Sequence, residues 1–284
     1  VSCNTQTKNQ IDYGSNTTSG KYLDVNDIKV YYEIYGEGEP LLLLHGNSGS
    51  IENFSTLIPE LSQHFKVIAV DSRAQGRSSD SEKEITYALM ASDMSELIKK
   101  LNFGSVSVAG FSDGGVIGLE LAYAHPEQVK KLVTLGANYS HENYSPPEDS
   151  IVMNENDPYI SKLKAIRKQR TENAAKRQFP KPVISPETKK KLSDLMEKYP
   201  NFTVEQLKQI RVPTLVTIGD HDVISLEHTI ELYKHLLHSY LFIIPGSTHI
   251  SLIEQPDLVS SEIIKFLDTP YRDIDRYYPW KIPK

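Results

Sequence analysis

Ser112 lies within residues 110–114, whose sequence Gly-Phe-Ser-Asp-Gly fits the pattern Gly-x-Ser-x-Gly. An apolar run at residues 106–109 precedes this pattern, and helical spacing follows it at residues 114–124. A sharp turn between a strand and a helix raises a serine hydroxyl above the edge of a sheet, where it can attack a carbonyl carbon. The flanking glycines favour such a turn because they allow backbone segments to approach closely. The pattern therefore predicts a nucleophilic serine, with an ordinary tight turn as the alternative.

A serine hydroxyl becomes a good nucleophile only when a base accepts its proton and an acid orients that base. Among nine histidines, His249 is the best candidate base, because it follows the apolar run at residues 241–244 after a short Pro-Gly-Ser-Thr loop. The carboxyl ends of parallel strands are where open α/β sheets place their sites. The apolar run at residues 215–218 is followed by two candidate acids, Asp220 and Asp222.

Short apolar runs of strand length alternate with helical patterns along most of the chain. The runs lie at residues 41–44, 67–70, 106–109, 132–135, 215–218 and 241–244, and the helical patterns lie at 52–64, 87–101, 114–124, 226–238 and 256–267. This alternation predicts an α/β fold with a mostly parallel, twisted sheet covered on both faces. Residues 22–25 and 28–35 flank an Asn-Asp turn, which predicts an antiparallel hairpin at the N-terminal edge of the sheet.

The alternation is interrupted once, between residues 139 and 210. This segment contains helical and proline-rich stretches but no convincing strand. It is too long for a simple connection and too short for an independent domain, so we predict a helical cap inserted into the core. The core would then comprise residues 21–138 and 211–284. Residues 1–20 are polar and poor in large aliphatic side chains, which predicts a flexible tether.

Composition excludes several classes of protein and site. The 284-residue chain has a formal net charge of −6, which argues against a nucleic-acid partner because such binders carry a basic surplus. Its single cysteine, Cys3, rules out an internal disulfide and any cysteine-based zinc site. No uncharged apolar run approaches the roughly 18 residues that a membrane span requires. No clustered ligands suggest a metal, and the chemistry expected at Ser112 requires no cofactor.

Several short motifs follow one another along the expected core. They are Leu-Leu-His-Gly-Asn at 43–47, Asp-Ser-Arg-Ala-Gln-Gly-Arg-Ser at 71–78, Gly-x-Ser-x-Gly at 110–114, Gly-x-x-Asp at 219–222, Gly-x-x-His at 246–249 and Glu-Gln-Pro at 254–256. With these motifs the chain from residue 21 to 267 resembles α/β-hydrolase fold enzymes that carry a helical cap. The resemblance implies a catalytic triad of Ser112, Asp222 and His249. Its Gly-x-x-Asp spacing favours Asp222 over Asp220 as the acid.

The same resemblance implies an oxyanion hole made by the backbone N–H groups of Asn47 and Asp113. Relatives of this fold that act on haloalkanes or epoxides use an aspartate nucleophile, whereas this chain has Ser112. A serine nucleophile implies acyl transfer, so we expect hydrolysis of a small-molecule carboxylic ester through an acyl-enzyme intermediate. The alternatives are a cofactor-free C–C bond hydrolase, a perhydrolase, or a non-enzymatic ligand-binding or receptor protein on the same fold.

Asp113 is unusual, because most serine hydrolases of this fold carry an uncharged residue after the nucleophile. Ser-Asp-Gly-Gly at 112–115 and Leu-Gly-Ala-Asn at 135–138 resemble the valacyclovirase-like branch, which hydrolyses α-amino acid esters. In that branch the aspartate pairs with the substrate ammonium, which implies a substrate-binding role for Asp113. The alternative is that Asp113 points away from the pocket and caps the following helix, where acidic side chains are favoured.

Cys3 follows Val1 and Ser2 and precedes a polar segment, which resembles the cleavage site of a bacterial lipoprotein. A lipid on Cys3 would tether the protein to a membrane and place it in the bacterial cell envelope. The alternative is an exposed cysteine near the terminus of a cytoplasmic protein.

Overall fold

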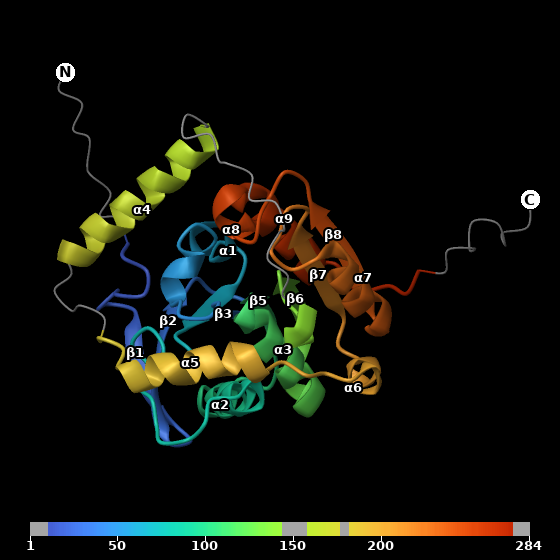
Figure 1. The fold of residues 1–284 in the computed structure, drawn as a ribbon, viewed down its shortest axis with the longest axis horizontal. Helices are drawn as coiled ribbons and strands as arrows, with labels where there is room; N and C mark the ends of the chain where they lie inside the picture. Colours follow the sequence, from blue (N-terminus) through green and yellow to red (C-terminus); the bar gives the residue numbers. More distant parts are fainter. Residues whose placement is uncertain (1–10, 144–157, 177–181, 275–284) are drawn as a thin grey trace, which may run out of the picture.

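The computed structural model describes residues 11–143, 158–176 and 182–274 (Figure 1). Eight strands form one sheet in the order β1-β2-β4-β3-β5-β6-β7-β8. Their bounds are β1 Gly20–Val25, β2 Ile28–Tyr35, β3 Pro40–Leu44, β4 Lys66–Val70, β5 Val106–Phe111, β6 Val129–Leu135, β7 Thr214–Gly219 and β8 Ser239–Ile244. This order places β5, the strand that leads to Ser112, well inside the sheet.

The predicted N-terminal hairpin and the mostly parallel sheet are both confirmed. β1 pairs antiparallel with β2 in a register that sets Val25 opposite Ile28, and Asn26 adopts the positive φ of 49° that suits a tight hairpin turn. β2 is also antiparallel to β4, whereas the remaining neighbours are parallel. Parallel neighbours bring their carboxyl ends to one edge, so the loops after β3, β5, β7 and β8 gather there.

Helices cover both faces of the sheet (Figure 1). Their bounds are α1 Ile58–Leu61, α2 Tyr87–Lys100, α3 Asp113–Ala124, α4 Pro158–Lys176, α5 Pro186–Lys198, α6 Val204–Gln209, α7 Leu226–His235, α8 Ser251–Glu254 and α9 Pro256–Asp268. α2, α3 and α7 pack on one face, and α1, α8 and α9 pack on the other. Leu42 and Leu44 of β3 face the first core, whereas Leu41 and Leu43 face the second. Because both faces are buried, the strand reads as an uninterrupted apolar run.

One predicted helix, at residues 52–64, is replaced by two shorter turns. A 3₁₀ helix spans Ile51–Phe54, and α1 begins only at Ile58. Pro59 lies in the first turn of α1, where its missing N–H breaks no helical hydrogen bond. In an uninterrupted helix its ring would clash with the carbonyl four residues earlier. The break is therefore a consequence of Pro59, which the apolar spacing alone did not reveal.

Segment 139–210 joins β6 to β7. In its described part the regular elements are α4, α5, α6 and a 3₁₀ turn at His141–Asn143. Strand-type pairing in the same part is limited to an isolated bridge between Ser140 and Asn201. α4 rests on the second core through Leu163 and Ile166. The role of this segment as a cap stays a prediction.

Polar contacts hold α5 against the rest of the molecule. Thr188 donates a hydrogen bond to the Asp80 carboxylate at 2.8 Å, and the Lys191 ammonium lies 3.3 Å from the same group. The Asn47 side-chain amide, which follows β3, donates to the Leu192 carbonyl at 3.2 Å. These contacts fix α5 beside the carboxyl edge of the sheet.

The N-terminal arm, residues 11–20, lies against the core, which differs from the flexible tether expected over residues 1–20. Glu33 of β2 is fully buried and accepts hydrogen bonds from the backbone N–H groups of Gly14 at 2.8 Å and Asn16 at 2.9 Å. The arm is held because a buried carboxylate needs donors, and these backbone groups supply them. Composition alone does not show such a partner.

No helix within the described ranges is long and apolar enough to cross a membrane. Cys3 lies outside the described residues, so its expected lipidation stays a prediction.

Candidate active site

Ser112 joins β5 to α3 in a conformation that few non-glycine residues adopt, with φ 52° and ψ −122°. A Cβ atom on Gly110 would lie 2.1 Å from the Gly114 carbonyl oxygen, and one on Gly114 would lie 1.9 Å from the Leu44 carbonyl oxygen. Neither position therefore has room for a side chain. The two glycines permit the close packing that raises Ser112 above the sheet edge.

The structure brings the three predicted triad residues into one hydrogen-bonded row. His249 Nε2 lies 3.0 Å from the Ser112 hydroxyl oxygen, and His249 Nδ1 lies 2.7 Å from Asp222 Oδ1. The Asp222 side chain is 2% exposed and the His249 side chain is 22% exposed. This geometry suits a histidine that accepts the serine proton through Nε2 while it donates to a buried carboxylate through Nδ1.

Asp220, the rival candidate acid, is engaged elsewhere. Its carboxylate accepts hydrogen bonds from the backbone N–H groups of Gly246 at 3.0 Å and Ser247 at 3.1 Å. Hydrogen bonding from Gly246, followed by that from His221, lowers the pKa of Asp220 to about 2. Asp220 therefore fixes the loop that leads toward the histidine, and the carboxylate that contacts the imidazole is Asp222.

Two further residues support His249. Gly136, after β6, has a φ of 63°, and a Cβ atom there would lie 3.0 Å from His249 Nδ1. A side chain at this position would crowd the imidazole. Glu254 of α8 accepts a hydrogen bond from the Thr248 N–H at 2.7 Å and also from the hydroxyls of Ser247 and Thr248. The sequence motif Glu-Gln-Pro contains Glu254 but indicates no role for it. In the structure, Glu254 holds Ser247 and Thr248, the two residues before His249.

The two predicted oxyanion donors follow neighbouring strand ends. Asp113 is the first residue of α3, and N–H groups in the first turn of a helix have no acceptor within that helix. Asn47 follows Gly46, and a Cβ atom on Gly46 would lie 3.1 Å from the Ser112 Cβ. Both segments therefore pass beside the nucleophile. Their role as an oxyanion hole stays a prediction.

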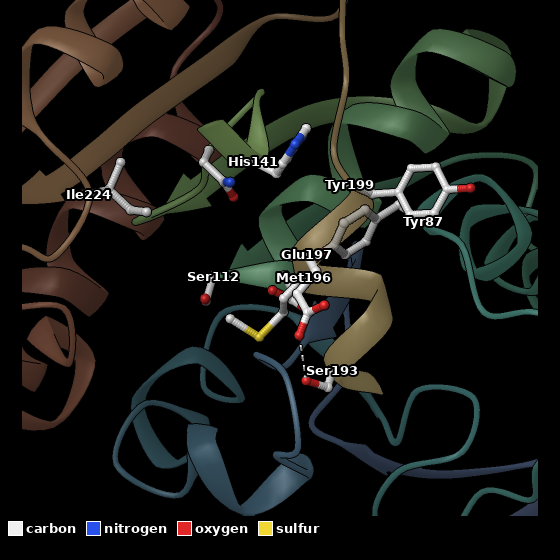
Figure 2. A pocket seen from close by; sticks show the side chains of 10 residues that line it. Tyr87, Ser112, His141, Ser193, Met196, Glu197, Tyr199 and Ile224 are labelled. Atoms are coloured by element: carbon white, nitrogen blue, oxygen red, sulfur yellow. Dashed lines mark hydrogen bonds between the residues drawn. The ribbon is translucent and has the colours of Figure 1, made fainter. Parts of the chain in front are cut away.

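A cavity of about 300 Å³ opens at Ser112 (Figure 2). Its walls come from the core and from segment 139–210, and they include Tyr87, Ser112, Asp113, His141, Ser193, Met196, Glu197 and Tyr199. Two of the lining residues that the structure describes are acidic, and none is lysine or arginine. The described residues also contain no group of three or more His, Cys, Asp or Glu side chains that could hold a metal ion.

Asp113 is among the residues that line this cavity. The residue is 6% exposed, and its Oδ2 atom has no hydrogen-bond partner among the described residues. Burial raises the pKa of Asp113 to about 6, whereas the Tyr87 hydroxyl, the Asn47 side chain and the His249 ring act in the opposite direction. A buried carboxylate oxygen without a donor is unfavourable.

Several cavity residues were not identified from the sequence. Tyr87 is the first residue of α2, Ile224 follows the acid by two positions, and Met196 and Glu197 belong to α5. None of them stands in a recognisable motif, because tertiary packing brings them to Ser112 from distant parts of the chain. The only available signal was that α5 lies in the segment expected to form a cap.

Comparisons with known proteins cover most of the chain. The family model described as the alpha/beta hydrolase fold matches residues 39–181, half of the chain. A 2-hydroxy-6-oxo-6-(2'-aminophenyl)hexa-2,4-dienoic acid hydrolase from Metapseudomonas resinovorans is 26% identical over 261 residues, which is 87% of this chain and 90% of the relative. Serine hydrolase BPHL from Homo sapiens is 29% identical over 249 residues, which is 84% of this chain and 82% of the relative.

A solved structure of similar fold is the meta-cleavage product hydrolase CumD from Pseudomonas fluorescens IP01. It aligns with a TM-score of 0.72 at 20% identity, over 89% of this chain and 99% of that chain. At this identity the likeness speaks to the fold alone. The fold expected from the sequence motifs is confirmed by both kinds of comparison.

Proposed function

The chain belongs to the alpha/beta hydrolase fold family, and we propose that it is a serine hydrolase that cleaves a carboxylic ester of a small molecule. The proposal rests on the unbroken row of contacts from Ser112 through His249 to Asp222, at 3.0 and 2.7 Å. A shared fold does not fix an activity. This row supplies what acyl transfer requires: a nucleophile, a base and an acid that orients the base.

In the proposed reaction, His249 Nε2 accepts the proton as Ser112 Oγ attacks the ester carbonyl carbon. The backbone N–H groups of Asn47 and Asp113 stabilise the oxyanion, where a single donor contributes about 3 kcal/mol in comparable enzymes. The imidazolium then donates its proton to the leaving alcohol, and an acyl-enzyme remains. Water activated by His249 hydrolyses this intermediate, while Asp222 stabilises the imidazolium in both half-reactions.

We propose that segment 139–210 serves as the helical cap and that residues 21–138 and 211–284 form the core. Support comes from α5, which contacts the core through Lys191 and supplies Glu197 to the cavity wall. Substrate selection would then depend on α5 as well as on the loops at the strand ends.

We further propose that the preferred substrate is an ester of an α-amino acid. Asp113 follows Ser112 directly and is among the residues that line the cavity, and one oxygen of its buried carboxylate has no hydrogen-bond partner among the described residues. A substrate ammonium next to the scissile carbonyl would supply the missing donor. It would also favour the ionised form of Asp113, against the burial that raises its pKa. The alternative is a purely structural role for Asp113 in the first turn of α3.

The test compares phenylalanine methyl ester with its des-amino analogue, methyl 3-phenylpropionate, in the wild type and in Asp113→Asn. We expect the wild type to prefer the amino ester in kcat/KM. In Asp113→Asn the preference should shrink by about 1.5–3 kcal/mol, the range for hydrogen bonds to charged groups. An equal loss on both esters would assign Asp113 to structure and leave a plain carboxylesterase.

A C–C bond hydrolase is the second candidate, since one relative is named as the hydrolase of a dienoic acid. Such an acid is an anion at neutral pH. The described cavity wall carries the carboxylates of Asp113 and Glu197 and no lysine or arginine, and like charges disfavour binding. Charge therefore favours the amino-ester hydrolase. A perhydrolase would use the same triad and differs only in the attacking molecule.

A non-enzymatic binding protein is the alternative from a different class. The two are separated by the time course of nitrophenol release from a nitrophenyl ester. A hydrolase should give a burst of one equivalent and then steady turnover, because the acyl-enzyme is hydrolysed. Release that stops after one equivalent would contradict the proposed function.

A further inference from the structure

The cavity at Ser112 carries a second carboxylate, that of Glu197 on α5 (Figure 2). Glu197 comes from the segment between β6 and β7, whereas Asp113 comes from the core. The Ser193 hydroxyl, one helical turn earlier, donates to Glu197 Oε1 at 3.2 Å, which Figure 2 shows as a dashed line. This contact fixes one carboxylate oxygen and leaves the other available to a ligand.

The lysines of α5 do not neutralise Glu197. Those in ion pairs have other partners: Lys190 with Asp194 at 2.7 Å, Lys191 with Asp80 at 3.3 Å and Lys198 with Glu84 at 3.0 Å. Within the described part of the chain, no cationic side chain forms an ion pair with Glu197. The Glu197 carboxylate therefore has no cationic partner among the described residues.

Asp113 adds an independent sign that a cationic group belongs in the cavity. It is 6% exposed, it lines the same cavity as Glu197, and its Oδ2 atom lacks a partner among the described residues. The cavity is therefore lined by two carboxylates and by no lysine or arginine among the described residues. A ligand with two separated positive charges would place one at each carboxylate.

We propose that Glu197 binds a side-chain cation of the acyl group, so that the protein selects esters of basic α-amino acids such as lysine. This inference rests on the proposed function, in which Asp113 binds the α-ammonium and Ser112 takes the acyl group. The flexible alkyl chain of lysine separates its two cations and allows each to meet its own carboxylate. The ester bond breaks as described above: the alcohol leaves with the proton from His249, and water then releases lysine.

The experiment compares kcat/KM for lysine methyl ester and norleucine methyl ester. Both carry the α-ammonium, and norleucine lacks only the terminal ammonium. The ratio is measured in the wild type, in Glu197→Gln and in Glu197→Lys. Glu187→Gln is the matched control, because it removes the same charge from α5 at an exposed position outside the described cavity wall.

We expect the wild-type ratio to favour lysine about fivefold or more, which corresponds to the upper end for a solvent-accessible ion pair. The ratio should fall to about one in Glu197→Gln and below one in Glu197→Lys, where like charges meet. It should be unchanged in Glu187→Gln. A lysine preference that survives in both Glu197 variants would overturn the inference.

The inference on Glu197 and the proposed amino-ester hydrolysis would be contradicted by different results. If both esters are hydrolysed and the wild type does not distinguish them, the inference on Glu197 is wrong and the proposed hydrolase stands. If neither ester is hydrolysed faster by the wild type than by Ser112→Ala, amino-ester hydrolysis itself is wrong, and the inference on Glu197 falls with it.

Discussion

Asp220 and Asp222, the two carboxylates that follow β7, contact different partners, and this difference sets the expected effects of mutation. Asp222 contacts His249 Nδ1 at 2.7 Å, whereas Asp220 accepts from the backbone of the loop that precedes the histidine. We expect Asp222→Asn to lower kcat about 10⁴-fold, because the amide cannot stabilise the imidazolium. Asp220→Asn should lower kcat far less and should mainly lower the melting temperature.

Steady-state kinetics and thermal melting of both variants check this ranking. The reverse ranking, with Asp220→Asn the more damaging to kcat at an unchanged melting temperature, would move the acid to Asp220. It would also contradict the contact seen in the structure.

The burial of Asp113 predicts a pH-dependent stability. Its pKa is raised from 3.8 to about 6, mainly by desolvation, so the folded state holds the proton more tightly than the unfolded state. The stabilisation is therefore fully present below about pH 4 and is lost as pH rises through about 6. The free energy of unfolding that is lost across this pH range is on the order of 3 kcal/mol.

Thermal melting of the wild type and Asp113→Asn at several pH values measures this effect. We expect the stability of the variant minus that of the wild type to rise between about pH 4 and pH 6. Above that window this difference should stay constant. A difference in melting temperature that does not change with pH would show that Asp113 has an ordinary pKa in the folded protein.

At the residue scale, the sequence predicted the residues that stand in short local motifs. Ser112 and His249 could be placed because each follows an apolar strand pattern, and parallel strands bring their carboxyl ends together. The strand pattern left Asp220 and Asp222 as alternatives, and the Gly-x-x-Asp spacing of the resembling family favoured Asp222. Tyr87 and Glu197 could not be placed, since they reach the cavity only through the packing of α2 and α5. A single sequence shows which residues follow strands, but it does not show which faces of distant helices meet them.

The turn between β5 and α3 depends on the absence of side chains at its glycines. A Cβ atom on Gly114 would lie 1.9 Å from the backbone oxygen of Leu44, which cannot move without displacing β3. We expect Gly114→Ala to lower the free energy of unfolding by about 3 kcal/mol or more, at or beyond the upper end for overpacking. Chemical denaturation measures this loss.

Gly104→Ala is the matched control, because no atom lies within 4 Å of a Cβ atom there. This substitution should change the free energy of unfolding by less than about 1 kcal/mol. Equal effects of the two substitutions would show that the close approach of the elbow to β3 does not constrain the fold.

At the element scale, periodicity predicted the strands of the sheet and most of the helices that cover it. It failed where one residue or one distant partner decides the outcome. Pro59 divides the helix expected at residues 52–64, and buried Glu33 holds residues 11–20 against β2. Apolar spacing registers neither effect, since the first is a steric property of the backbone and the second is a polar tertiary contact.

At the scale of the whole molecule, the expected lipid on Cys3 is tested by fractionation of bacteria that express the full-length gene product. If Cys3 carries the lipid, the wild type should partition into membranes and Cys3→Ala should be released into the soluble fraction. The N-terminal arm would then join the lipid anchor to β2 through Glu33. Equal partitioning of the two forms would make Cys3 an incidental residue.

The central claim, that this is a hydrolase whose nucleophile is Ser112, is tested most directly by steady-state kinetics of Ser112→Ala on a nitrophenyl ester. The variant removes one oxygen and should fold normally, which its melting temperature verifies. We expect kcat to fall at least about a thousandfold, and the residual rate to reflect binding and the oxyanion hole. Retention of more than about a tenth of the wild-type kcat would contradict the account, because the variant lacks the hydroxyl that forms the acyl-enzyme.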